Sequence, residues 1–248
     1  MNNNKLLKNI VLLAVMSALS FALCFVQIPL GVMGKIHLGN FACILAALLF
    51  GPIIGGLSGS IGMGLSDLVS GYEFDSILRT LILKFLIGAI AGLIYKKYKN
   101  KDIKSLILIP LLLFLTIGIT SLVLVIIGKG EYVFYIGNSK TTVNLLIPIF
   151  ALILFLIMLI LFIVSLKKTV EESIVLVATS YAIIFNIIVE FFLRFLLKLM
   201  YVDANTSLAL AITKIPSSIL TGVVTIIFIP IVFIPLKKAL LKTGTIAQ

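Results

Sequence analysis

Long apolar runs, separated by short polar or basic segments, make up most of this chain. Several runs have the roughly 20 residues with which a helix crosses the hydrocarbon core of a bilayer. The runs expected to form helices cover residues 9–29, 41–50, 53–70, 76–95, 105–127, 141–166, 173–200 and 207–235. The pattern therefore predicts an all-α integral membrane protein of about eight transmembrane helices, forming a single membrane domain over residues 1–248.

The second and third apolar runs are separated only by Gly51-Pro52. This dipeptide predicts two short helices joined by a tight turn. The helix after the turn is rich in glycine and serine, and small side chains allow helices to approach closely in lipid. The polar segments at residues 31–40 and 128–140 are expected to be loops.

The overall composition excludes an ordinary soluble protein. Hydrophobic residues make up 61% of the chain and charged residues 12%, whereas soluble domains have about 45–50% and about 25%. So few charges cannot cover a surface that faces water, so a soluble enzyme and a nucleic-acid-binding protein are both excluded. Cys24 and Cys43 lie inside apolar runs and do not indicate a disulfide scaffold.

The net charge of +11 is best explained by membrane topology, because cytoplasmic loops of membrane proteins collect Lys and Arg. Twelve of the 20 basic residues lie in segments that an even number of crossings would put on one side. These segments are the N-terminus, residues 96–104, residues 167–168 and residues 237–242. We therefore expect a multi-pass protein of the plasma membrane, surrounded by the lipid bilayer, with both termini in the cytoplasm.

Ionisable residues inside the apolar runs are the most informative feature, because a charge within a membrane is costly and usually faces a cavity or a partner. Six charged residues of these runs fall in the outer halves of their helices: Asp67, Arg79, Lys84, Glu190, Arg194 and Lys214. This asymmetry predicts a polar cavity open to the outside. The alternative is that the charges only neutralise one another, as Asp67 with Lys84 and as Glu190 with Arg194 one helical turn away.

The proposed cavity has further polar candidates on the first outer loop and the last two helices. We expect Lys84, Arg194 and Lys214 to meet an anionic or carbonyl-bearing ligand. Hydrogen bonds would come from Asn40, Asn186, Glu190 and Ser217. The complete set of candidate substrate-binding residues is Lys35, His37, Asn40, Asp67, Tyr72, Arg79, Lys84, Asn186, Glu190, Arg194, Lys214 and Ser217.

Several short motifs together resemble a known family of membrane proteins. They are Ile36–Asn40, Ala46–Pro52, Gly59–Gly62, Ser66-Asp67, Gly71-Tyr72, Lys84, Gly88–Gly92 and Ile215–Gly222. This combination, over about residues 8–100 and 175–240, resembles the substrate-binding S components of energy-coupling factor (ECF) vitamin transporters. It is most similar to the riboflavin and hydroxymethylpyrimidine type group.

The resemblance implies a binding subunit with six core helices and a pocket on the outer side. The first four core helices would cover residues 8–104 and the last two residues 173–242, with residues 105–166 inserted as an apolar two-helix hairpin. Such a subunit captures a water-soluble vitamin or vitamin precursor. It then works with a transmembrane coupling (T) subunit and two ABC ATPases, toppling in the membrane to release the substrate inside.

The first helix of such S components carries small residues that pack on the coupling subunit. Here Ala14, Ala18 and Ala22 are four residues apart and line one helix face. Such a stripe permits close helix contact. Ordinary packing inside the protein is the alternative explanation for the same stripe.

No catalytic constellation accompanies these features. The glycines near residue 60 lack the Gly-Lys-Ser/Thr of a phosphate-binding loop, so the chain is not expected to hydrolyse ATP, and no other enzymatic activity or cofactor is expected. A single His and two distant Cys exclude a clustered metal site. The alternative function is a self-sufficient secondary transporter, driven by protons or sodium through Asp67 and Glu190.

Overall fold

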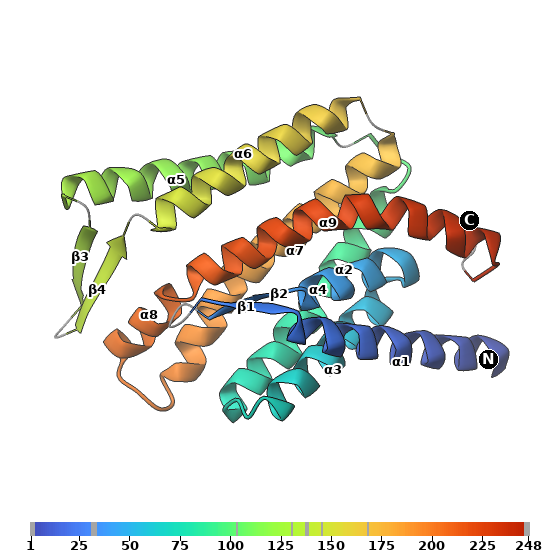
Figure 1. Ribbon diagram of the computed structural model, residues 1–248, viewed down its shortest axis with the longest axis horizontal. Coiled ribbons are helices and arrows are strands. Elements are labelled where there is room, and N and C mark those ends of the chain that lie inside the picture. Colours follow the sequence, from blue (N-terminus) through green and yellow to red (C-terminus); the bar gives the residue numbers. More distant parts are fainter. Residues whose placement is uncertain are drawn as a thin grey trace.

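The computed structural model describes residues 3–30, 34–102, 104–129, 131–136, 139–144, 146–167 and 169–245. Helices dominate these residues and run roughly along one common direction (Figure 1). The helices are α1 (Asn3–Phe25), α2 (Gly39–Phe50), α3 (Pro52–Val69), α4 (Phe74–Tyr98), α5 (Leu108–Ile127), α6 (Leu146–Leu166), α7 (Val170–Lys198), α8 (Ala204–Ile212) and α9 (Ile215–Lys242). A short 3-10 helix, η2 (Lys104–Ile107), precedes α5.

Length and composition confirm the prediction of an all-α membrane protein. Five helical segments among the described residues are long and apolar enough to cross a bilayer. They cover Asn4–Phe25, Phe74–Tyr98, Ser105–Ile127, Val170–Lys198 and Ala204–Lys242. The helices α2 and α3 are shorter or less apolar and form a hairpin at the Gly51-Pro52 turn, as the sequence predicts.

The bundle has three layers. The helices α1 to α4 form one side, α7 and α9 lie in the middle, and the α5–α6 hairpin covers the outer face of α7 and α9 (Figure 1). The peripheral hairpin corresponds to residues 105–166, and its status as an insertion into a six-helix core stays a prediction. The core lies where α2, α4, α7 and α9 meet, around side chains such as Ile87, Ile183 and Phe233.

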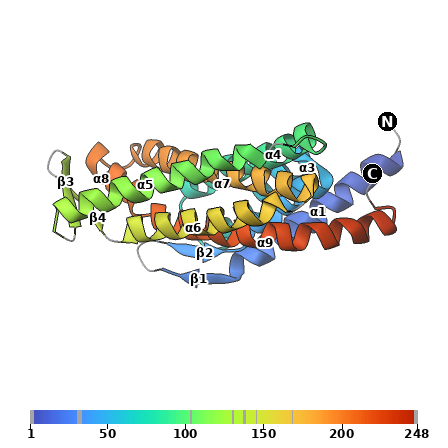
Figure 2. The same cartoon turned by 90° about the horizontal axis from the view of Figure 1, so that it is seen from above.

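Two segments expected to be loops contain paired strands instead. The strand β1 (Gln27–Pro29) pairs with β2 (Lys35–His37), and β3 (Glu131–Ile136) pairs with β4 (Ser139–Asn144), both antiparallel. Residues 31–33, 130 and 137–138 of the expected loops lie outside the described residues. The β3–β4 hairpin is at the end of the bundle opposite the termini (Figure 2).

These strands also correct two helix boundaries. The first helix ends at Phe25 rather than at Pro29, because a residue that precedes proline favours an extended backbone. Helix α6 begins at Leu146 rather than at Thr141, because the β-branched residues Thr141 to Val143 suit a strand.

The last apolar run is also divided, into α8 and α9 at Thr213-Lys214. Asp203 caps the start of α8 by accepting hydrogen bonds from the backbone N–H groups of Asn205 and Thr206. Pro216 lies in the first turn of α9, where a proline fits because the first amides of a helix have no partner within the helix. A new helix therefore starts where one continuous span was expected.

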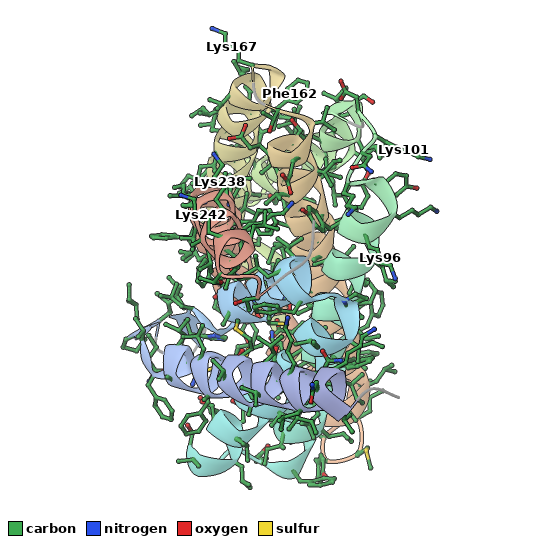
Figure 3. The ribbon with its side chains drawn as sticks, turned by 90° about the vertical axis from the view of Figure 1, so that its right-hand side faces the viewer. Lys96, Lys101, Phe162, Lys167, Lys238 and Lys242 are labelled. Atoms are coloured by element: carbon green, nitrogen blue, oxygen red, sulfur yellow. The ribbon has the colours of Figure 1, made fainter. Side chains whose placement is uncertain are left out.

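The basic segments used to predict topology gather at one end of the bundle. Figure 3 shows Lys96, Lys101, Lys167, Lys238 and Lys242 around that end, and Figure 1 places both termini there. Lys168 lies outside the described residues. The assignment of this end to the cytoplasm stays a prediction.

Glycine allows α2, α3 and α4 to pack backbone against backbone. A Cβ atom on Gly88 would lie 2.6 Å from the carbonyl carbon of Gly55, and one on Gly92 would lie 2.6 Å from the Cα of Pro52. A Cβ on Gly55 would come within 2.3 Å of the Cα of Ala47. No side chain fits at these crossings without moving a helix, so they fix the relative positions of the three helices.

We expect Gly88→Val to lower the thermal midpoint of the detergent-purified protein markedly. Overpacking costs about 1–3 kcal/mol, and the atoms in the way here are backbone atoms that cannot rotate aside. Leu93→Val is the matched control, since Leu93 is on the same helix and 56% exposed. Equal midpoints for the two variants would contradict the proposed crossing.

Candidate functional site

A polar cavity of about 160 Å³ lies between α3, α4, α7 and α9, under the β1–β2 hairpin. It is in the half of the bundle away from the termini, because α7 ends there and α9 begins there (Figure 1). All of the candidate substrate-binding residues line this one cavity: Lys35, His37, Asn40, Asp67, Tyr72, Arg79, Lys84, Asn186, Glu190, Arg194, Lys214 and Ser217. Their role in binding stays a prediction.

The cavity wall includes further residues that sequence reasoning did not single out. They are Cys24, Gly34, Met63, Ser76, Thr80, Ser218 and Thr221. The helical repeat could have identified four of them: Ser76 and Thr80 precede Lys84 at steps of four, and Ser218 and Thr221 follow Lys214 at steps of four and three.

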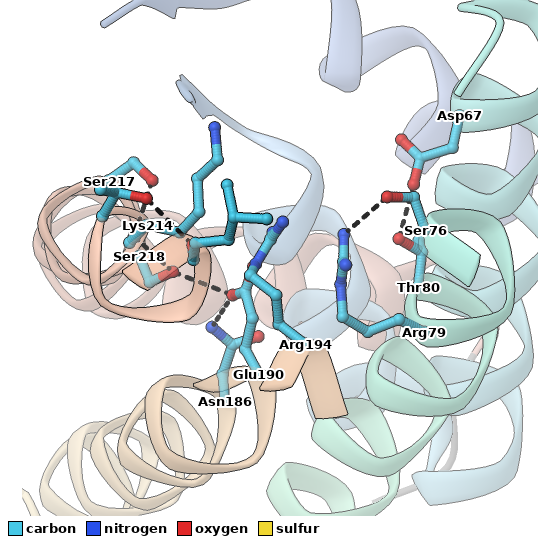
Figure 4. A network of polar contacts seen from close by, with 12 residues as sticks. Asp67, Ser76, Arg79, Thr80, Asn186, Glu190, Arg194, Lys214, Ser217 and Ser218 are labelled. Atoms are coloured by element: carbon cyan, nitrogen blue, oxygen red, sulfur yellow. Dashed lines mark hydrogen bonds and ion pairs between the residues drawn. The ribbon is translucent and has the colours of Figure 1, made fainter. Parts of the chain in front are cut away.

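Glu190 is the centre of a hydrogen-bond network that joins α7 and α9 (Figure 4). Its carboxylate accepts hydrogen bonds from Ser218 Oγ at 2.9 Å, from Asn186 Nδ2 at 3.4 Å and from Arg194 Nη2 at 3.4 Å. Residues four apart share a helix face, which brings Asn186 and Arg194 to Glu190 from either side. Asn186 Oδ1 in turn accepts from Lys84 Nζ at 3.1 Å and so links α4 to the network.

The ion-pair alternative is therefore correct for one pair and wrong for the other. Glu190 and Arg194 form the expected pair. Asp67 instead accepts a hydrogen bond from Thr80 Oγ1 at 2.5 Å, and within the described residues it forms no ion pair with Lys84. The two side chains face the same cavity from α3 and α4.

Arg79 is the least satisfied charge of the site. Its side chain is 7% exposed and donates to Ser76 Oγ at 3.2 Å, while Nη1 has no hydrogen-bond partner in the part of the chain that the structure describes. Arg194 Nε and Asn40 Oδ1 are buried and unpartnered in the same sense. Buried polar atoms without partners are rare in folded proteins, so three in one cavity make it the candidate binding site.

The β1–β2 hairpin brings His37 to the cavity as a neutral hydrogen-bond donor. Burial, together with the nearby charges of Lys84 and Lys35, lowers the pKa of His37 to about 3. Its Nδ1 accepts a hydrogen bond from the Gly39 N–H at 3.1 Å, so the neutral ring carries its proton on Nε2. This N–H is suited to donate to a bound molecule.

The same hairpin is held in place from two sides. Lys35 Nζ lies 5.2 Å from the centre of the Tyr72 ring, a cation–π contact to the α3–α4 turn. Gly34 has a φ of 111°, and a Cβ there would lie 3.2 Å from Ser217 Oγ on α9. The backbone of the hairpin therefore approaches α9 closely and covers the cavity.

The candidate partner-binding residues lie on the free face of α1. Ala14, Ala18 and Ala22 are all exposed, whereas Met16 and Ser20 of the same helix are buried against the bundle. Packing inside this chain therefore does not explain the alanine stripe.

An all-α membrane protein with a polar cavity near one end of its bundle is the class that the fold and the site define. A family model described as "ECF-type riboflavin transporter, S component" matches residues 4–168, and the chain belongs to this family. The description of the family is that of the S component of a transporter. The matched stretch ends before α7.

The other comparisons are less informative. The chain is 34% identical over 84 residues to an "Uncharacterized protein in gap 3'region" of Pyrococcus woesei. That match covers 34% of this chain and 55% of the relative, so the chain spans about half the length of the curated protein it matches. No solved structure matches.

We expect Glu190→Gln to destabilise the protein without changing its fold. The substitution removes the only negative charge near Arg194 at ion-pair distance among the described residues. The two side chains are only partly buried, so the cost should be smaller than the about 3–5 kcal/mol of a fully buried pair. The thermal midpoint in detergent should fall by several degrees. Glu172→Gln is the control: Glu172 is partly exposed in the first turn of the same helix, and glutamine also completes a capping box. Equal midpoints would show that Glu190 does not hold the network together.

Proposed function

We propose that this protein is the high-affinity substrate-binding subunit of an ECF-type ABC importer and captures a water-soluble vitamin or vitamin precursor from outside the cell. One observation carries the proposal. Polar residues from α3, α4, α7, α9 and the β1–β2 hairpin, far apart in the sequence, converge on one cavity. Charged and polar groups are costly to bury in a membrane, and those that are retained usually face a cavity or a partner. Their convergence on one cavity therefore favours a binding site over scattered ion pairs.

The distribution of charge supports an outward-facing cavity. Lysines concentrate at the end that carries the termini, and an end rich in basic residues normally faces the cytoplasm (Figure 3). The cavity lies in the other half of the bundle. Substrate would therefore enter from outside, and its release inside would require a large movement of the subunit, driven by the ATPases of the partner module.

The exposed stripe of Ala14, Ala18 and Ala22 is the proposed contact with the coupling (T) subunit. Small side chains let a partner helix approach the backbone closely. The face opposite the stripe packs on α3, and α1 contributes only Cys24 to the described cavity wall, so a partner can bind the stripe without contacting the polar residues of that wall.

The ion-coupled alternative finds less support in the geometry. A coupling carboxylate must bind and release a cation during each cycle, yet Glu190 accepts hydrogen bonds from three side chains, including Arg194. Uptake that continues without the ATPases and stops when the ion gradient collapses would favour this alternative.

We expect a thermal-shift screen of the detergent-purified chain against water-soluble vitamins and precursors, riboflavin included, to give at least one stabilising compound without ATP or partner proteins. A ligand at a hundred times its dissociation constant adds about 2.7 kcal/mol to the stability of the folded state. Lys84→Met should abolish this shift, because Lys84 lines the cavity and is 7% exposed.

Lys96→Met is the matched control, since Lys96 is exposed on the same helix near the termini. It should leave the shift unchanged. A screen without any stabilising compound, or a full shift in Lys84→Met, would contradict the assignment of the cavity.

We expect Ala18→Trp to prevent copurification with the T subunit and the ATPases while leaving the ligand-induced thermal shift intact. The indole would hold a partner helix away from the α1 backbone. Leu19→Trp is the control, because this exposed position is about 100° around the same helix. Loss of copurification in both variants would place the contact elsewhere on α1.

A further inference from the structure

The wall of the cavity carries an excess of positive charge. Its described cationic residues are Lys35, Arg79, Lys84, Arg194 and Lys214, and its carboxylates are Asp67 and Glu190. His37 adds no charge, since its pKa is about 3. Cations enclosed among helices repel one another more strongly than in water, because the surrounding medium screens them less. A bound anion would relieve this repulsion.

Arg79 and Arg194 differ in whether a carboxylate lies at ion-pair distance, and this difference indicates where a bound anion would sit. Arg194 has Glu190 at 3.4 Å, whereas within the described residues no carboxylate lies within ion-pair distance of Arg79. Arg79 is nevertheless buried, and its Nη1 has no partner. Both side chains extend from their helices toward the same part of the cavity (Figure 4). The unpartnered donors of the two guanidinium groups thus form a receptor for a planar or tetrahedral oxyanion.

The size of the cavity limits the rest of the ligand. A cavity of about 150 Å³ holds one benzene molecule, and the cavity here is about 160 Å³. A single six-membered ring with a small substituent fits that space, whereas the three fused rings and side chain of a flavin would extend out of the partly open cavity.

The chemistry of the wall also disfavours a flavin. A large aromatic ligand is usually bound between apolar and aromatic side chains, but Tyr72 and His37 are the only aromatic residues among the described lining, and Tyr72 is already engaged by Lys35. The wall from α7 and α9, with Arg194 and Lys214, also lies beyond the stretch that matches the riboflavin family.

We propose that the cavity binds a small organic anion, a single-ring compound with a carboxylate or phosphate group held by Arg79 and Arg194, in preference to riboflavin. This inference rests on the proposed function, because it names the class of substrate for the same site. Lys84 and the Nε2–H of His37 line the same cavity and would donate to polar atoms on the ring.

The test compares ligands of equal size that differ in charge. The dissociation constants of benzoate and the three pyridine carboxylates are measured on the purified chain, beside those of the matching carboxamides, phenyl phosphate and riboflavin. We expect at least one acid to bind about tenfold or more tightly than its amide, since a hydrogen bond to a charged group contributes more than one to a neutral group. Comparing the dissociation constants of benzoate and phenyl phosphate shows which of the two anionic groups the cavity prefers.

The variant Arg79→Gln should abolish the preference for the acid and should not lower the stability of the ligand-free protein, because it removes a buried cation that has no carboxylate at ion-pair distance among the described residues. Arg194→Gln should lower that stability, because it breaks the pair with Glu190. Lys96→Gln, exposed on the same helix as Arg79, should change neither quantity.

The inference is overturned if riboflavin binds as tightly as the best acid, if no acid binds more tightly than its amide, or if Arg79→Gln retains the preference. A failure of the proposed function would look different. The acids would still bind in an Arg79-dependent manner, but cells that lack the coupling subunit and ATPases would take them up as fast as cells that contain them.

Discussion

The close crossing of α2, α3 and α4 at glycine residues is the constraint on which the remaining structure depends. Because Gly55 and Gly88 carry no side chains, α3 and α4 lie in backbone contact, and Cys43 Sγ lies 3.4 Å from both the Gly55 and the Lys84 carbonyl oxygens. This contact fixes the rotation of α4 about its axis. One face of α4 therefore points toward α7 and α9, and that face carries Arg79 and Lys84.

The polar network follows from this orientation, but a stable fold does not require charged residues at these positions. Replacing a buried ion pair by well-packed apolar residues is often neutral or stabilising, so a buried pair alone gives little reason to retain charge. The chain nevertheless encloses Lys84, Glu190 and Arg194 together, and leaves Arg79 with a neutral acceptor only. An arrangement that carries this cost without full compensation is best explained by the molecule that it binds.

The sequence predicted the charged part of the site because a charge within a membrane is informative wherever it occurs. The hydroxyl residues were missed because burying a serine or threonine in a membrane helix costs little free energy, so their presence there is not informative. Ser218 Oγ donates to the Lys214 carbonyl of its own helix as well as to Glu190. A serine or threonine whose hydroxyl can donate to a backbone carbonyl of its own helix does not indicate a binding site in the sequence. The strands and the α8–α9 break were missed because local effects at Pro29, Thr141 and Pro216 interrupt runs whose hydropathy is continuous.

The residues of the site come from two parts of the chain, of which only the first lies in the stretch that matches the family model. Asp67, Arg79 and Lys84 come from the stretch that matches the family model, whereas Glu190 and Arg194 come from α7, beyond its end. The hydrogen bond from Lys84 to Asn186 joins the two halves. A change in α7 or α9 can therefore alter what the cavity accepts while α1, with its exposed alanine stripe, keeps the surface proposed to bind the coupling subunit. If both proposals hold, ligand identity and coupling are separable, because the charged cavity residues and the alanine stripe lie on different helices.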